Sequence, residues 1–161
     1  MKSKTIQLSI LEYNSLKELP EDYLKLLETA TFAAKNAYAP YSHFNVGAAA
    51  LLDNGEIISG NNQENAAYPS GICAERVVVF FANAQFPENK ILTLALVAFQ
   101  NGKDMTEMPV PPCGSCRQVI LESQIRQNEP IKLILFGSKK IYVIEDASLL
   151  LPISFNKNMI L

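Results

Sequence analysis

The chain has 161 residues, 48% hydrophobic and 19% charged, a composition typical of one folded domain and not of a disordered chain. Its net charge of −2, without a cluster of lysine and arginine, argues against a long nucleic acid as the main partner. No apolar stretch approaches the roughly 20 residues of a membrane span, and polar residues interrupt any signal-peptide core near the N-terminus. We therefore expect a cytoplasmic protein with no membrane partner.

The first part of the chain predicts a strand, a helix and a hairpin. Residues 5–13 alternate apolar and polar side chains, as a strand does. Residues 20–40 carry apolar side chains at helical spacing between two prolines, which predicts a helix that starts and ends at these prolines. Residues 44–60 predict a hairpin, because Asn54–Gly55 is a strong signal for a two-residue turn.

The rest of the chain predicts alternating helices and strands. After a polar loop, the further elements are a buried helix at 73–86, a buried strand at 91–99, a loop through Pro112, a helix at 114–124, strands at 131–137 and 141–145, and a short helix from Asp146 through Leu151. This order predicts an α/β fold, a three-layer α/β/α domain with a mixed sheet of about five strands. We find no linker or repeat, so residues 1–161 are expected to form a single domain.

The three cysteines carry the strongest chemical signal. Cys113 and Cys116 are three residues apart at a predicted helix start, so their thiols share one face within reach of a single ion. The helix N-terminus also favours the thiolate form. Cys73 stands at another junction of loop and helix, and all three sulfurs would then bind one Zn²⁺ per chain. On its own, the pair of Cys113 and Cys116 would also suit a redox pair or two small buried residues.

Three protein ligands leave a fourth zinc position for water, which is the pattern of a catalytic site. The one histidine, His43, would close the site, but a histidine in such a junction is more often a packing or hydrogen-bonding residue. Glu75 is near enough to Cys73 to take a proton from that water; its alternative role is to complement the helix dipole. Arg76 and Arg117 each follow a cysteine motif and would offset the thiolate charge, or else be solvated arginines.

With these motifs assembled, the chain resembles the zinc-dependent cytidine deaminases of the small, homotetrameric class. The resemblance rests on PYSHFNVGAAAL, GNNQENAAYPSGICAER, PPCGSCRQVI and LLPISF, and it includes the deaminase pattern of a ligand-x-Glu followed by P-C-x-x-C. It covers a core of about residues 20–155. Residues 1–18 are then an N-terminal extension, and the segment before Pro112 is longer than is usual in this class.

The resemblance implies a reaction and a set of roles. The reaction is hydrolytic deamination of cytidine and deoxycytidine to uridine and deoxyuridine with release of ammonia, in pyrimidine salvage. A zinc-bound hydroxide attacks the base, and Glu75 shuttles the protons. The implied substrate contacts are Phe44 on the pyrimidine, main chain near Ala74 at the base edge, and Asn62 and Glu64 on the sugar hydroxyls; Ala66, Tyr68 and Phe155 would contribute to a neighbouring subunit's site in a homotetramer. The alternative is that the aromatic residues are core residues and the polar pair caps turns.

Three other functions fit part of the pattern. A deaminase of a nucleoside antibiotic such as blasticidin S shares CAE and PCGxCRQ, but the pair of Asn62 and Glu64 favours a nucleoside. A polynucleotide-editing deaminase is disfavoured by the acidic balance and by a cysteine as first ligand. A structural zinc module for protein interaction predicts a closed fourth position and no role for Glu75.

Overall fold

The structure, a computed structural model, describes residues 1–160. At its centre is a seven-stranded sheet in the order β1-β7-β6-β4-β2-β3, with β5 paired to β4. The strands are β1 (Leu11–Tyr13), β2 (Phe44–Leu52), β3 (Ile57–Asn61), β4 (Ile91–Gln100), β5 (Asp104–Met105), β6 (Lys132–Phe136) and β7 (Ile141–Ile144). β4 and β6 pair in parallel and the other pairs are antiparallel. The predicted α/β class with a mixed sheet is confirmed, although the sheet has seven strands and not about five.

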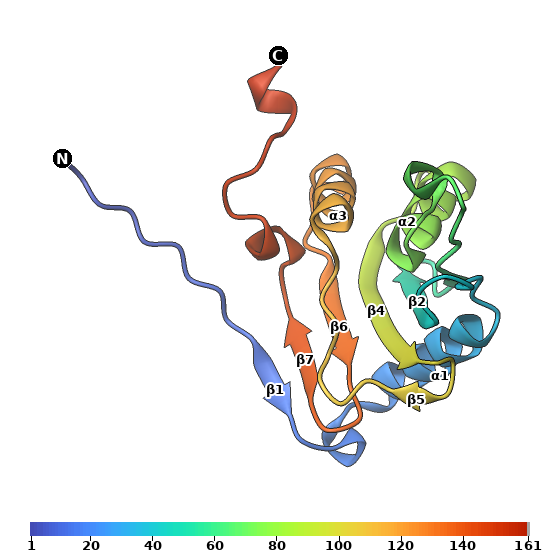
Figure 1. Ribbon diagram of the computed structural model, residues 1–161. Helices are drawn as coiled ribbons and strands as arrows, with labels where there is room; N and C mark the ends of the chain where they lie inside the picture. Colours follow the sequence, from blue (N-terminus) through green and yellow to red (C-terminus); the bar gives the residue numbers. More distant parts are fainter. Residues whose placement is uncertain (161) are drawn as a thin grey trace.

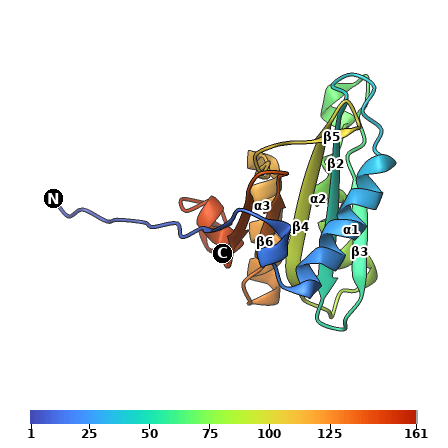
Figure 2. The same cartoon turned by 90° about the horizontal axis from the view of Figure 1, so that it is seen from below.

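The α-helices cover both faces of the sheet, as Figure 1 shows. They are α1 (Glu21–Lys35), α2 (Ala74–Gln85) and α3 (Gly114–Gln127). α1 lies on one face and crosses the central strands in the view from below (Figure 2), while α2 and α3 lie on the other face. Separate apolar clusters fill the two interfaces, which confirms the predicted three-layer arrangement. None of the helices in residues 1–160 is long and apolar enough to cross a membrane.

The sequence of β4 explains why helices pack on both of its faces. Leu94 and Leu96 belong to the cluster under α2 and α3, whereas Ala95 and Val97 belong to the cluster under α1. Successive side chains of a strand point to opposite faces, so a strand covered on both sides is an unbroken apolar run. The apolar run at 91–99 is therefore the sequence signature of a central strand, and β4 lies between β2 and β6.

The helix predicted over residues 20–40 is shorter in the structure and ends at Lys35. Tyr38 leaves the helix to pair with the segment after β3: its N–H donates to the Asn62 carbonyl, and its own carbonyl accepts from the Glu64 N–H. Pairing with a distant segment thus replaces the last helical turn, which helix spacing alone could not reveal.

The strand predicted over residues 5–13 is also shorter, because only β1 finds a partner. β7 ends at Ile144, after which the chain turns into a 3₁₀ helix, Ala147–Leu150, where a short helix from Asp146 through Leu151 was predicted. The predicted cap is present, since the Asp146 carboxylate accepts a hydrogen bond from the Ser148 N–H. The segment before β1 extends away from the body (Figure 1).

The N-termini of α2 and α3 lie beside each other at one end of the sheet, and this placement builds the site. The two helices are in contact, and the Asn83 Nδ2 of α2 donates to the Ser123 Oγ of α3 at 3.2 Å. The residues that precede each helix therefore lie close together at this end of the sheet. Side chains from two separate loops are neighbours there.

Replacing Gly47 with alanine should destabilise the fold, because a Cβ there would lie 1.9 Å from the Ala30 carbonyl oxygen of α1. Overpacking costs about 1–3 kcal/mol, occasionally more, and we expect a melting temperature at least about 5 °C below wild type in circular dichroism. Gly114→Ala is the control, since a Cβ there meets nothing within 4 Å. A Gly47→Ala protein that melts with the wild type would contradict the close packing of α1 on β2.

Candidate functional site

Three cysteine sulfurs meet where α2 and α3 begin. Cys73 is the N-cap residue of α2, and Cys113 is the N-cap residue of α3. Cys116 lies in the first turn of α3 and is buried. The Sγ atoms of Cys113 and Cys116 are 3.4 Å apart, and those of Cys73 and Cys113 are 4.0 Å apart. The structure thus brings the three predicted metal ligands together within 4.8 Å of one another.

The spacing of these sulfurs fits a tetrahedral metal ion. A Zn–S bond of about 2.3 Å puts the sulfurs of a tetrahedral site about 3.8 Å apart, between the two observed separations. Neither N-cap cysteine uses its side chain to cap its helix, so both sulfurs point elsewhere. Within residues 1–160 the cluster includes no fourth cysteine, histidine or carboxylate, and His43 lies outside it. The donor set therefore suits zinc with one position left for a small molecule.

Two thiols of the cluster differ in how readily they ionise. Hydrogen bonds from the Cys116 thiol and from Arg76 stabilise the Cys73 thiolate and lower the pKa of Cys73 to about 5. The bond to Cys73 and burial instead raise the pKa of Cys116 above its ordinary value. One thiolate thus opposes the ionisation of the next. A divalent cation allows all three sulfurs to be negative, and its binding releases protons.

The two arginines that follow the cysteine motifs have different contacts. The Arg76 Nη2 lies 3.9 Å from the Cys73 Sγ, and its Nε is buried without a hydrogen-bond partner in residues 1–160. Arg117 instead donates to two backbone carbonyls, that of Pro112 at 2.9 Å and that of Leu150 at 3.2 Å. Arg76 therefore brings positive charge close to the sulfurs. Arg117 instead connects α3 to the loop before it and to the 3₁₀ helix Ala147–Leu150.

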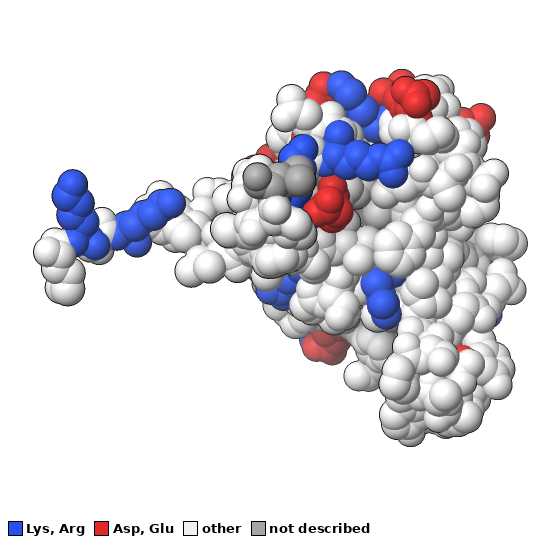
Figure 3. All heavy atoms as spheres, turned by 90° about the horizontal axis from the view of Figure 1, so that it is seen from above, with Lys and Arg blue, Asp and Glu red and all other residues white. Residues whose placement is uncertain are grey.

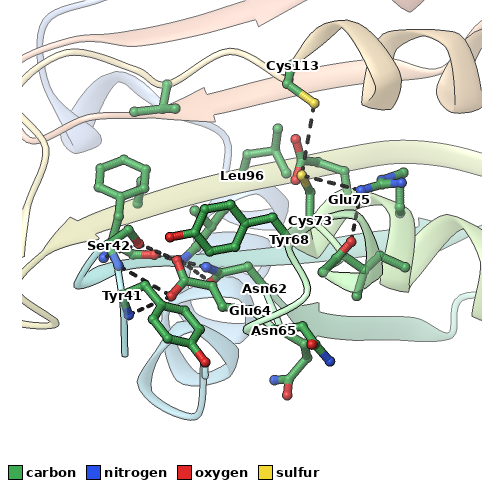
Figure 4. A pocket seen from close by; sticks show the side chains of 18 of the residues that line it. Tyr41, Ser42, Asn62, Glu64, Asn65, Tyr68, Cys73, Glu75, Leu96 and Cys113 are labelled. Atoms are coloured by element: carbon green, nitrogen blue, oxygen red, sulfur yellow. Dashed lines mark hydrogen bonds between the residues drawn. The ribbon is translucent and has the colours of Figure 1, made fainter. Parts of the chain in front are cut away.

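A cavity of about 770 Å³ opens beside the sulfur cluster, and Cys73, Cys113 and Glu75 line it (Figure 4). The Glu75 residue is only 5% exposed. Its burial raises the pKa of its carboxyl above the ordinary value, and the Cys73 thiolate adds to this shift. A carboxyl at the wall of a cavity next to this cysteine cluster is placed to exchange protons with a molecule bound there.

Asn62 lines the same cavity and is tied to β2. Its Oδ1 accepts a hydrogen bond from the Val46 N–H at 2.8 Å, and its Nδ2 donates to the Phe44 carbonyl at 2.9 Å. An amide group has room for a second bond at each end. Asn62 therefore holds the start of β2 in place and still has a donor and an acceptor for a ligand.

Glu64 lies across the cavity from the sulfurs, with a loop wrapped around its carboxylate (Figure 4). It accepts hydrogen bonds from the Ser42 hydroxyl at 2.5 Å, from the Ser42 N–H at 3.3 Å and from the Tyr41 N–H at 2.9 Å. The Ser42 hydroxyl and these N–H groups lower the pKa of Glu64 below its ordinary value. This wall of the cavity therefore carries the negatively charged Glu64 carboxylate, which can accept hydrogen bonds from the hydroxyl groups of a ligand.

The other predicted site residues occupy three kinds of position. Phe44 and Tyr68 line the cavity, Phe44 half-buried and Tyr68 exposed. Ala74 is buried as the first residue of α2 and leaves its N–H among the unpaired ones of the helix start. Ala66 and Phe155 are exposed and lie outside the lining of the cavity in their own chain.

The structure adds cavity residues that the sequence did not single out. Tyr41 packs edge-to-face on Tyr68, with ring centroids 6.1 Å apart, and Ser42 holds Glu64. Val110 and Pro111 form part of the wall near the cysteines. Tyr41, Ser42 and Pro111 lie within motifs of the resemblance and Val110 is next to one, which was the available signal, but only a folded chain shows that they face the same space.

Comparison with known proteins assigns these motifs to one family. The family model described as "Cytidine and deoxycytidylate deaminase zinc-binding region" matches residues 20–128. A cytidine deaminase of Halalkalibacterium halodurans is 44% identical over 101 residues, which are 63% of this chain and 71% of that protein. A cytidine deaminase of Mycobacterium tuberculosis is 41% identical over 114 residues, which are 69% of this chain and 80% of that protein.

Solved structures show the same likeness. The crystal structure of cytidine deaminase from Burkholderia pseudomallei has a TM-score of 0.71 at 35% identity and matches 83% of this chain and 98% of that one. The crystal structure of cytidine deaminase from Mycobacterium tuberculosis has a TM-score of 0.66 at 34% identity and matches 85% of this chain and 99% of that one. The likeness therefore spans sequence and fold together.

The purified protein should contain about one zinc ion per chain, as elemental analysis by mass spectrometry would measure, because three sulfurs at these separations form a zinc-binding set. Cys116→Ala should lose nearly all of this zinc. Glu75→Gln is the matched control and should keep it, since Glu75 lies beside the cluster without being part of it. Zinc retained at the wild-type level in Cys116→Ala would refute the site.

Proposed function

The chain belongs to the cytidine and deoxycytidylate deaminase family and is an enzyme, and on that premise we propose that it hydrolyses cytidine and deoxycytidine to uridine and deoxyuridine, with release of ammonia. The observation that carries this proposal is that Cys73, Cys113 and the buried Glu75 line one cavity, with the Cys116 sulfur within 4.8 Å of the other two sulfurs. This reaction would serve pyrimidine salvage in the cytoplasm.

In the proposed mechanism, Cys73, Cys113 and Cys116 hold zinc and Glu75 moves the protons. Zinc in this position supplies a water molecule with a lowered pKa as nucleophile. Glu75 takes a proton from the attacking water and gives it to N3 of the pyrimidine. It then carries the second proton to the 4-amino group, which leaves as ammonia, so that one water is consumed for each ammonia released.

The remaining walls of the cavity would orient the nucleoside. Glu64 would accept hydrogen bonds from the sugar hydroxyls, and Asn62 would use its free amide capacity in the same place. Phe44 would pack on the pyrimidine ring, and the Ala74 N–H would bind an edge of the base. Arg76 would offset the charge of the Cys73 thiolate and keep its sulfur in place. The spread of polar groups across a cavity of about 770 Å³ supports a ligand of nucleoside size.

We also infer a homotetramer in which each site borrows residues from neighbouring subunits. Ala66, Tyr68 and Phe155 would make these contributions. Their exposure in the single chain supports this role, because each is available to a second chain. For Phe155, the hydrogen bond from the Gln118 Nε2 to its carbonyl at 2.9 Å fixes the backbone and leaves the ring exposed.

Glu75→Gln should lose nearly all turnover of cytidine, because an amide cannot carry the protons. The loss of a general acid and base is expected to lower kcat by about 10²–10⁴-fold. The fall in ultraviolet absorbance as cytidine becomes uridine would measure kcat. Binding of uridine, the proposed product, should change little, which calorimetry would measure. A kcat within a few-fold of wild type, in protein with full zinc content, would contradict the proton-transfer role.

Glu64→Gln should raise the KM for cytidine about 10- to 100-fold, since a hydrogen bond to a charged group contributes about 1.5–3 kcal/mol. Ser42→Ala is the matched control, because it removes the internal partner of the carboxylate at 2.5 Å and keeps the charge. Its KM should rise far less. If both variants raise the KM equally, Glu64 acts by holding the loop and its role as a sugar ligand is wrong.

A further inference from the structure

Residues 1–10 form an arm that leaves the body of the protein in both cartoon views (Figures 1 and 2). The arm continues directly into β1, the terminal strand of the sheet, whose outer edge pairs with no other strand in the described chain. All residues of the arm are exposed, and they make no side-chain hydrogen bond within residues 1–160. The arm is therefore a continuation of an open sheet edge into solvent.

The sequence predicts a longer strand in this part of the chain than the one that pairs with β7. Residues 5–13 alternate as a strand, yet the ladder between β1 and β7 stops at the pair of Leu11 and Val143. In this register Ile10 would face Ile144, the last residue of β7, and any further pair would need residues beyond it, where the chain turns away into the 3₁₀ helix. The strand-forming residues of the arm thus extend past the end of β7, and their backbone groups are open to a strand from elsewhere.

The apolar side of the arm is symmetric about Leu8. Ile6 and Ile10 lie two residues before and after Leu8, and Lys4 and Glu12 lie four residues before and after it. In an antiparallel pair of identical strands centred on Leu8, Leu8 faces the partner's Leu8 and Ile6 faces the partner's Ile10. The same register sets Lys4 opposite the partner's Glu12, so that opposite charges meet at each end of an apolar centre.

We propose that the arms of two copies of this chain pair as antiparallel strands centred on Leu8 and join the two sheets into one. The pairing is isologous, with the same residues contributed by each copy about a two-fold axis. The arm of each copy lies along the open edge of the other's β1, which supplies the backbone partners that such an edge lacks. A second copy suits the role of partner because its arm, running in the opposite direction, sets apolar residues against apolar ones and Lys4 against Glu12.

The charges of the molecule are compatible with this pairing. Lys2 and Lys4 are the only charged side chains of the arm, and Figure 3 shows basic side chains along it, clear of the acidic groups on the body. Glu12 is anchored on the body by an ion pair with Lys140 and remains partly exposed. In this register Lys4 of each arm faces Glu12 of the other copy, an acid that already pairs with Lys140.

The register can be tested by cross-linking the full-length chain through a single added cysteine. Residues directly opposite each other in an antiparallel pair have Cα atoms about 4.5–5.5 Å apart, within the range that a disulfide spans. Leu8→Cys should therefore form a disulfide dimer on mild oxidation with oxidised glutathione, seen as a band of doubled mass on a non-reducing gel. Wild-type protein run beside it accounts for the three native cysteines.

Ile6→Cys is the matched control, since Ile6 is 46% exposed and Leu8 42%, on the same side of the arm. In the proposed register the two copies of residue 6 lie four residues apart, or roughly 13 Å along the strands, too far for a disulfide. Leu8→Cys should give at least about ten times more dimer than Ile6→Cys. Equal cross-linking of the two variants, or none above wild type in either, would overturn the proposal. Neither result bears on the deaminase chemistry, because the arm lies apart from the cavity.

Discussion

The meeting of two helix N-termini is the constraint on which the site depends. The starts of α2 and α3 place Cys73, Cys113 and Cys116 within 4.8 Å of one another, where the ionisation of one thiol opposes that of the next. Helix N-termini favour negative sulfur, yet three thiolates so close together require a cation between them. Arg76 supplies part of the positive charge, and zinc would supply the rest.

The two sides of the cavity are built by different means. Helices covered by apolar clusters hold the sulfurs and Glu75, so their geometry is as rigid as the core. On the opposite side, the side chains of Asn62 and Glu64 hold the chain in place through hydrogen bonds with backbone groups of residues 41–46. The same polar residues that would bind a sugar therefore also give the loop its shape. This double use explains why capping and ligand binding were both reasonable interpretations of these residues from sequence.

Sequence patterns predicted those structural features that depend only on residues close together along the chain. The i, i+3 spacing of Cys113 and Cys116 predicts their common face because one helical turn fixes it. The two arginines, by contrast, each come directly after a cysteine motif, and only the fold shows that Arg76 reaches a sulfur while Arg117 reaches backbone carbonyls. The length of β1 was likewise beyond prediction, since it depends on where β7 ends and not on the alternation of residues 5–13.

In the proposed site, three sulfurs hold zinc and its fourth position is open to the cavity. X-ray absorption spectroscopy at the zinc edge of the purified protein tests this arrangement directly. We expect about three sulfur neighbours at about 2.3 Å and one oxygen neighbour at about 2.0 Å. A spectrum that fits four sulfurs, or three sulfurs and an imidazole, would show a fourth protein ligand on zinc and would contradict an open fourth position.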